Sequence, residues 1–133
     1  MQRETDSRRD GIEREFRYAI QALAADPDAQ IATLSPGCVT CELYEDFAGY
    51  YQAYLDAFAN DLIEPQRAQI IALHDALEAM PDADCECGNV DLLNRESWSR
   101  VRKMARAALE SLGWPLQPPP AFHEIEPGVW KRT

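Results

Sequence analysis

Residues 42–62 read ELYEDFAGYYQAYLDAFANDL, and this stretch decides the fold. Its large apolar side chains recur at spacings of three and four, which is the period of one face of an α-helix. They are Tyr44, Phe47, Tyr51, Tyr54, Phe58 and Leu62. We therefore predict a helix over about 42–62 whose aromatic face lies in the core. The alternative is a small-molecule sensor with a pocket at Tyr51 and Tyr54, because tyrosine hydroxyls need a partner or water.

Apolar residues at helical spacing continue on both sides of this stretch. They predict further helices over about 10–24, 65–80 and 94–112. Pro65 suits the first turn of a helix, and Gly113 is a strong stop signal. The predicted fold class is all-α: a four-helix, bundle-like single domain.

Three segments depart from this helical pattern. Residues 1–9 are densely charged, and we interpret them as an N-terminal arm. The proline run QPPP favours an extended chain, so we predict an extended tail over 114–133 that packs on the bundle. Trp130 in this tail is alternatively part of a partner interface. Residues 30–34 are short and partly β-branched, which leaves an extended conformation open.

The four cysteines of the chain fall into two pairs, CVTC at residues 38–41 and CEC at residues 85–87. One pair precedes the predicted helix 42–62 and the other follows the predicted helix 65–80. The connection between these helices is very short, which predicts an antiparallel hairpin. Both pairs should therefore lie at the same end of that hairpin, although 44 residues separate Cys41 from Cys85.

Four thiolates at one place are the ligand set of a structural zinc ion. We predict a site formed by Cys38, Cys41, Cys85 and Cys87, and an iron–sulfur cluster accepts the same ligands. Basic residues that follow this set are expected to offset its negative charge: Arg95, Arg100, Arg102, Lys103 and Arg106. His123 is a possible substitute for one cysteine.

Other interpretations of the cysteines remain open, namely disulfides between the pairs, unrelated thiols, or a redox couple at Cys38 and Cys41. A CxxC turn that opens a helix is typical of thiol oxidoreductases. The sequence resembles the helical alkylhydroperoxidase-D family in this CxxC, but Glu45 stands where that family has a histidine. The redox alternative would make the protein a reductase or peroxidase.

The sequence lacks the other motifs that would indicate catalysis. HExxH, the zinc-deaminase signature, paired Glu-x-x-His, a P-loop, a dinucleotide glycine fingerprint and GxSxG are all absent. We interpret His74 as a histidine with a local hydrogen bond. Glu42, Glu45 and Asp46 are interpreted as acids favoured by the dipole at a helix start. An enzyme is therefore less favoured than a non-catalytic protein.

The formal net charge is −10, and residues 18–94 contain a single base, Arg67. This charge argues against binding to nucleic acid or to an anionic membrane surface. We find no apolar run long enough for a membrane span and no signal peptide, so we expect a cytoplasmic protein. The acidic surface is either a solvated face or a docking face for a basic protein. The sequence thus predicts an interaction or inhibitor-like module with a structural zinc site.

Overall fold

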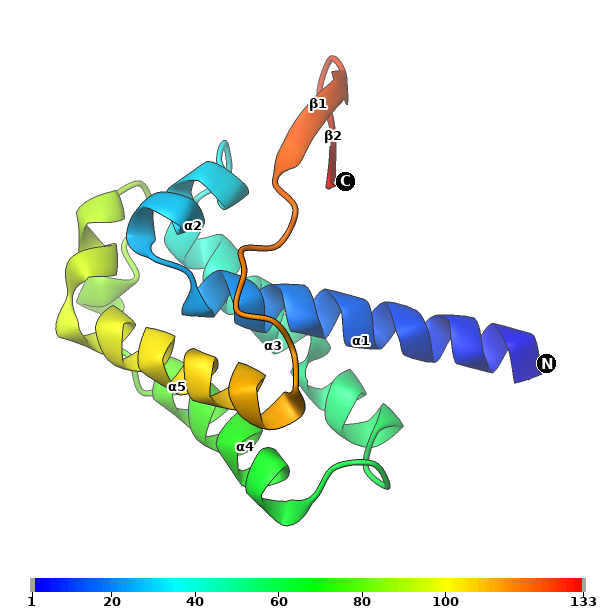
Figure 1. Ribbon diagram of the computed structural model, residues 1–133. Coiled ribbons are helices and arrows are strands. Elements are labelled where there is room, and N and C mark those ends of the chain that lie inside the picture. Colours follow the sequence, from blue (N-terminus) through cyan, green and yellow to red (C-terminus); the bar gives the residue numbers. More distant parts are fainter. Residues whose placement is uncertain (1, 133) are drawn as a thin grey trace.

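The computed structural model describes residues 2–132, with side chains from residue 6 onward. Over this range the chain forms five α-helices, two 3-10 helices and a two-stranded sheet (Figure 1). The α-helices are α1 (Gln2–Ala24), α2 (Pro27–Leu34), α3 (Val39–Ala57), α4 (Glu64–Glu78) and α5 (Glu96–Leu112). The 3-10 helices η1 (Asp82–Asp84) and η2 (Val90–Asn94) lie between α4 and α5, and strands β1 (Phe122–Glu126) and β2 (Val129–Arg132) follow α5.

The aromatic face of α3 lies in the core, as its spacing predicts. Helix α1 packs against both α3 and α5, and α5 packs against α4. Phe16 of α1 is fully buried, and its ring lies 4.6 Å from Tyr54 and 5.2 Å from Phe47. Tyr54 also stacks on Phe58, at 4.7 Å. These rings fill the space that a ligand pocket at Tyr54 would need.

Helices α3 and α4 run antiparallel, so the predicted hairpin is present. Tyr44 in the second turn of α3 donates a hydrogen bond to Glu78, the last residue of α4. Further along, Tyr51 stacks on His74 with ring centroids 4.0 Å apart. The end of α4 therefore lies beside the beginning of α3, where the first cysteine pair is located.

The N-terminal half is more helical than we predicted. Helix α1 already begins at Gln2, so residues 2–9 are not a separate arm. Arg9 explains this difference, because it donates to the carbonyl of Ala57 at 3.3 Å, lies over the ring of Phe58 and pairs with Asp61. These contacts attach the charged end of α1 to the end of α3.

Residues 30–34 belong to the helix α2, so the extended conformation left open for them is wrong. The side chain of Gln30 is buried here and donates to the carbonyls of Ala22 and Leu23, at 3.0 and 3.3 Å. Backbone carbonyls in the last turn of a helix lack partners within that helix. Gln30 can donate to these carbonyls only when residues 30–34 form a helix next to the end of α1.

The tail is not simply extended, and the fold is therefore not all-α. Strands β1 and β2 form an antiparallel hairpin in which Phe122 pairs with Arg132 and Glu124 pairs with Trp130. Pro127 and Gly128 form the turn, and Gly128 has a φ of 79°, which side-chain-bearing residues rarely adopt. Figure 1 shows that this hairpin projects away from the helices.

Candidate metal centre

Three of the four cysteines come together at the beginning of α3. The Sγ atoms of Cys38, Cys41 and Cys87 all lie within 4.8 Å of one another. Thiolates at about 2.3 Å from a tetrahedral zinc ion are about 3.8 Å apart, so each pair of sulfurs would need to approach by at most about 1 Å. This group of thiols could therefore hold a metal ion.

Helix α3 supplies two of these thiols from its first turn. Cys38 is the N-cap residue, and Cys41 lies three residues further along. The preceding turn is tight, because the N–H of Gly37 donates to the carbonyl of Leu34 at 3.0 Å. A β-carbon on Gly37 would lie 3.1 Å from the Glu42 side chain, so glycine allows the chain to pass close to the helix.

Cys87 reaches the cluster from a loop that is fixed on both sides. Before the loop, Asp84 accepts hydrogen bonds from Ser97 Oγ and, at its backbone carbonyl, from Trp98 Nε1, both at 2.7 Å. After the loop, Leu93 is fully buried, and its carbonyl accepts a 3.0 Å hydrogen bond from Arg102. Because both ends are held by α5, the loop presents Cys87 to the start of α3.

Cys85 is not among these three thiols, so the predicted set of four ligands is seen in part and Cys85 as a ligand stays a prediction. Its side chain is half-buried, packs against the hydrophobic core and lines a cavity of about 310 Å³. Cys41 and Tyr44 of α3 and Glu78 of α4 line the same cavity. Hydrogen bonds from α5 fix Asp84, so Cys85, the next residue, lies on the side of the loop that faces the core. Cys87 is two residues further along the chain and is exposed.

The pKa values of the three thiols depend on one another. Burial raises the pKa of Cys38, but hydrogen bonds with Cys87 and Cys41 and with the Cys41 N–H outweigh burial and lower this pKa to about 6. The hydrogen bond with Cys38, burial and the negative charge of Cys38 together raise the pKa of Cys41 to about 12. The hydrogen bond with Cys38 likewise raises the pKa of Cys87. One thiolate is thus stabilised at the expense of its neighbours, and a bound cation would relieve that conflict.

Neither histidine belongs to the thiol cluster, so the proposed substitution of His123 for a cysteine has no support. His123 lies in β1, where it pairs with Lys131. His74 stacks on Tyr51, and its nitrogens lie 3.5 Å from Asp75 and 3.6 Å from Glu78. These local contacts agree with the interpretation of His74 as a histidine with a structural role.

Two of the five basic residues expected to offset the charge of the thiol cluster, Arg102 and Arg106, bind the end of α1 instead. Arg102 donates to the carbonyl of Ala25 and Arg106 donates to that of Ala24, both at 2.9 Å. Arg106 also pairs with Asp26 at 2.9 Å. These arginines therefore bind the carbonyl end of α1, where the helix dipole favours positive charge.

The sequence analysis missed the residues that orient the cysteine loop. Thr40 is one neighbour of the cluster, with its Oγ1 3.6 Å from Cys38 Sγ. Asp84, Ser97 and Trp98 determine which cysteine of the CxC faces α3. The only available signal was that Asp84 immediately precedes Cys85.

Comparison with known proteins provides no relative for this chain: it matches no protein-family model, no curated protein and no solved structure. Among the described residues, no helix combines the length and apolar character needed to cross a bilayer. The thiol cluster is therefore the main chemical feature from which a function can be argued.

Proposed function

We propose that this protein is a non-catalytic interaction module in which one zinc ion, the zinc staple, holds two parts of the fold together. Cys38, Cys41 and Cys87 supply three thiolates, and their mutual approach within 4.8 Å is the observation that carries the proposal. Zinc is favoured because it is bound by thiolates in small, closed tetrahedral sites. An iron–sulfur cluster is the alternative occupant.

Cys85 completes the site as the fourth thiolate in this proposal. It lines the same cavity as Cys41, and in this proposal a rearrangement of the loop brings its sulfur to the cluster. Metal binding supplies the free energy for such an adjustment. A zinc ion with four thiolates has a formal charge of −2 and no open position, and it therefore serves structure rather than catalysis.

The staple would connect the beginning of α3 to the loop that precedes α5. Cys38 and Cys41 belong to α3, and the anchors of the Cys87 loop belong to α5. With a net charge of −10, the protein presents a surface suited to a basic protein partner. A reducing compartment such as the cytoplasm keeps the thiols available for metal.

Elemental analysis of protein purified under reducing conditions tests the metal site. We expect about one zinc per chain, and we expect a chelator to lower the melting temperature. Cys87→Ser should abolish zinc binding, Cys85→Ser should weaken it, and His123→Gln serves as a control that leaves it unchanged. Metal-free protein that is equally stable with and without chelator would refute the zinc staple.

A thiol oxidoreductase is the second candidate, and the pKa of about 6 at Cys38 supports it. The Cys38 thiolate would attack a substrate disulfide and release one thiol. Cys41 would then lose its proton, form the Cys38–Cys41 disulfide and release the second thiol. This candidate requires turnover with a dithiol reductant that Cys38→Ser abolishes, and protein that binds zinc and shows no turnover excludes it.

A further inference from the structure

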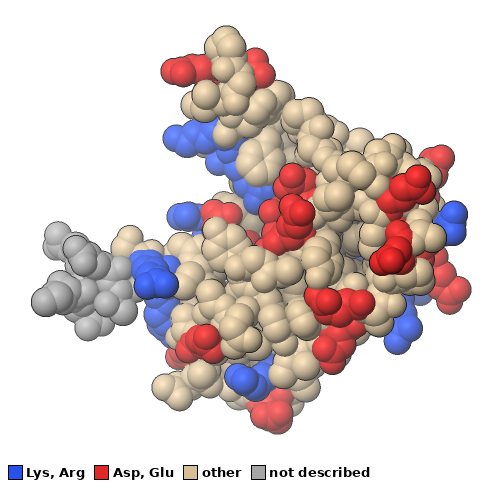
Figure 2. Space-filling model, turned by 180° about the vertical axis from the view of Figure 1, so that it is seen from behind, with Lys and Arg blue, Asp and Glu red and all other residues tan. Residues whose placement is uncertain are grey.

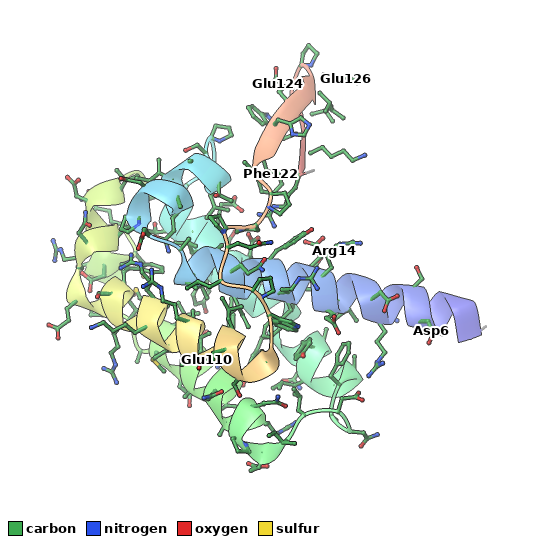
Figure 3. All side chains as sticks on the ribbon, in the orientation of Figure 1. Asp6, Arg14, Glu110, Phe122, Glu124 and Glu126 are labelled. Atoms are coloured by element: carbon green, nitrogen blue, oxygen red, sulfur yellow. The ribbon has the colours of Figure 1, made fainter. Side chains whose placement is uncertain are left out.

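The hairpin formed by β1 and β2 exposes an unusual amount of apolar surface. Its side chains Ile125, Val129 and Trp130 are 51%, 45% and 43% exposed. Figure 3 shows Phe122 at the base of the hairpin and Glu124 and Glu126 on the part farthest from the helices. An exposed apolar surface with charged residues around it is typical of an interaction site.

The base of the hairpin is seated on the helices, so the hairpin has a defined position. The side chain of Arg132 is only 10% exposed and lies 4.0 Å from the carboxylate of Asp46 in α3. Its guanidinium also lies 4.3 Å from the ring centroid of Phe122 and 5.4 Å from that of Tyr18 in α1. Cation–π contacts of this kind help to hold the hairpin against α1 and α3.

Both edges of this two-stranded sheet lack a neighbouring strand within the described chain. An edge strand presents unpaired N–H and C=O groups that can pair with another chain. The pairing of Glu124 with Trp130 puts these two side chains on one face. The register then shifts, so Glu126 pairs with Val129, whose side chain points to the other face, and the two glutamates lie on opposite faces. Apolar side chains on both faces suit the addition of a strand, because an added strand contacts both faces at once.

The charge of β1 indicates the kind of strand that fits. This strand carries Glu124 and Glu126, which lie near the tip of the hairpin, where Figure 2 shows acidic side chains. Pairing β1 with β1 of a second copy would bring four glutamates onto one pair of strands, and pairing β2 with β2 would bring the two Lys131 side chains together. Like charges across a ladder are destabilising, so the geometry disfavours both pairings of like edges.

We propose that β1 binds an extended, lysine- or arginine-rich segment of another protein by β-strand addition. This inference rests on the proposed function as an interaction module and names its docking surface and its class of partner. Main-chain hydrogen bonds to β1 provide affinity, and the pairing of basic side chains with Glu124 and Glu126 provides specificity. Ile125, Val129 and Trp130 cover the apolar side chains of the added strand.

A synthetic heptapeptide with three consecutive lysines between two pairs of valines presents lysine to both faces and tests this proposal, with binding followed by amide NMR shifts. We expect the shifts to concentrate in β1. Glu124→Lys combined with Glu126→Lys should weaken binding at least tenfold, and a milder pair, Glu124→Gln with Glu126→Gln, should weaken it less while preserving the hairpin. Glu96→Lys combined with Glu110→Lys in α5 is the charge-matched control and should bind nearly as well as the wild type.

A second peptide separates strand addition from general charge attraction. It has the same sequence, but alternate residues are N-methylated, so it keeps its charge and loses the ladder hydrogen bonds. Equal affinity for the two peptides overturns the proposal. An affinity loss in the α5 control as large as that in Glu124→Lys with Glu126→Lys overturns it as well. A dimer detected by sedimentation without peptide, and lost in Glu124→Lys with Glu126→Lys, assigns the edge to a second copy instead.

These measurements test the proposed zinc site and the proposed docking surface on β1 independently of each other. Peptide binding is compared between wild-type protein and Cys87→Ser, whose zinc content is determined independently. Protein that holds zinc and shows no shifts in β1 refutes the docking surface alone. Protein that binds the peptide and contains no zinc refutes the staple alone.

Discussion

The indole Nε1 of Trp98 donates a 2.7 Å hydrogen bond to the backbone carbonyl of Asp84. Trp98 is 1% exposed in the first turn of α5, so the contact ties the cysteine loop to the core. Cys87 lies three residues beyond Asp84 and joins the thiols of α3. The orientation of the proposed zinc ligand thus depends on a contact made by α5.

Replacing Trp98 by phenylalanine should weaken zinc binding. The change keeps an aromatic ring and removes the hydrogen bond to Asp84, at a cost of about 1–3 kcal/mol in unfolding free energy. We expect the zinc dissociation constant, measured by competition with a chelating dye, to increase about tenfold. Trp114→Phe, which alters a half-buried tryptophan outside the loop, is the control. Unchanged zinc affinity in Trp98→Phe would show that Asp84 does not position Cys87.

The same contact explains why sequence identified only part of the site. The short connection between α3 and α4 correctly indicated that the two cysteine pairs approach each other. Which cysteine of CEC faces α3 depends on the anchoring of Asp84 by Ser97 and Trp98. These contacts join residues 13 and 14 positions apart, so no local pattern encodes them.

The fold was predictable where side chains follow a helical period. The aromatic residues of α3 repeat at three and four and are found in the core, as at Phe47 and Tyr54. The first turns of α1 lack such a pattern and depend on the contacts of Arg9 with Ala57 and Asp61. The terminal hairpin consists of only eleven strand and turn residues, 122–132, and its contact with Asp46 of α3 is a long-range one.

Removing the ring of Phe16 should strongly destabilise the protein. Phe16 is fully buried between Tyr54 and Phe47, so Phe16→Ala leaves a cavity where α1 meets α3. Such substitutions cost about 3–5 kcal/mol. Urea unfolding should report this loss, and Tyr50→Ala, at a side chain 37% exposed, should change stability by less than about 1 kcal/mol. A small effect of Phe16→Ala would contradict the described core.

Two glycines should respond oppositely to alanine. Gly49 lies within α3, and a β-carbon there would meet nothing within 4 Å, so Gly49→Ala should stabilise the protein by about 0.5–1 kcal/mol. Gly128 has a φ of 79°, so Gly128→Ala should strain the turn and broaden the NMR signals of β1 and β2. Thermal unfolding measures the first effect. The turn geometry is wrong if Gly128→Ala leaves the hairpin signals unchanged.

Asp46 should make the stability of the protein depend on pH between about 4 and 6. Burial, followed by the charge of Glu42, raises the pKa of this carboxyl from 3.8 to about 6, against the opposing effect of Arg132. The folded state therefore binds this proton more tightly than the unfolded state does. The resulting stabilisation is fully present below about pH 4 and is lost as the pH rises through 6. Its size is about 1 kcal/mol once solvent screening of a side chain 34% exposed is allowed for.

Asp46→Asn isolates this contribution. Stability is measured by urea unfolding at pH 4, 5, 6 and 7, with a chelator present so that the effect of pH on metal binding is removed. The free energy of unfolding of the wild type should fall relative to that of Asp46→Asn as the pH rises. Asp28→Asn, at an exposed side chain, is the matched control for the substitution itself. Parallel curves for wild type and Asp46→Asn would mean that the Asp46 carboxyl ionises as freely in the folded protein as in the unfolded chain.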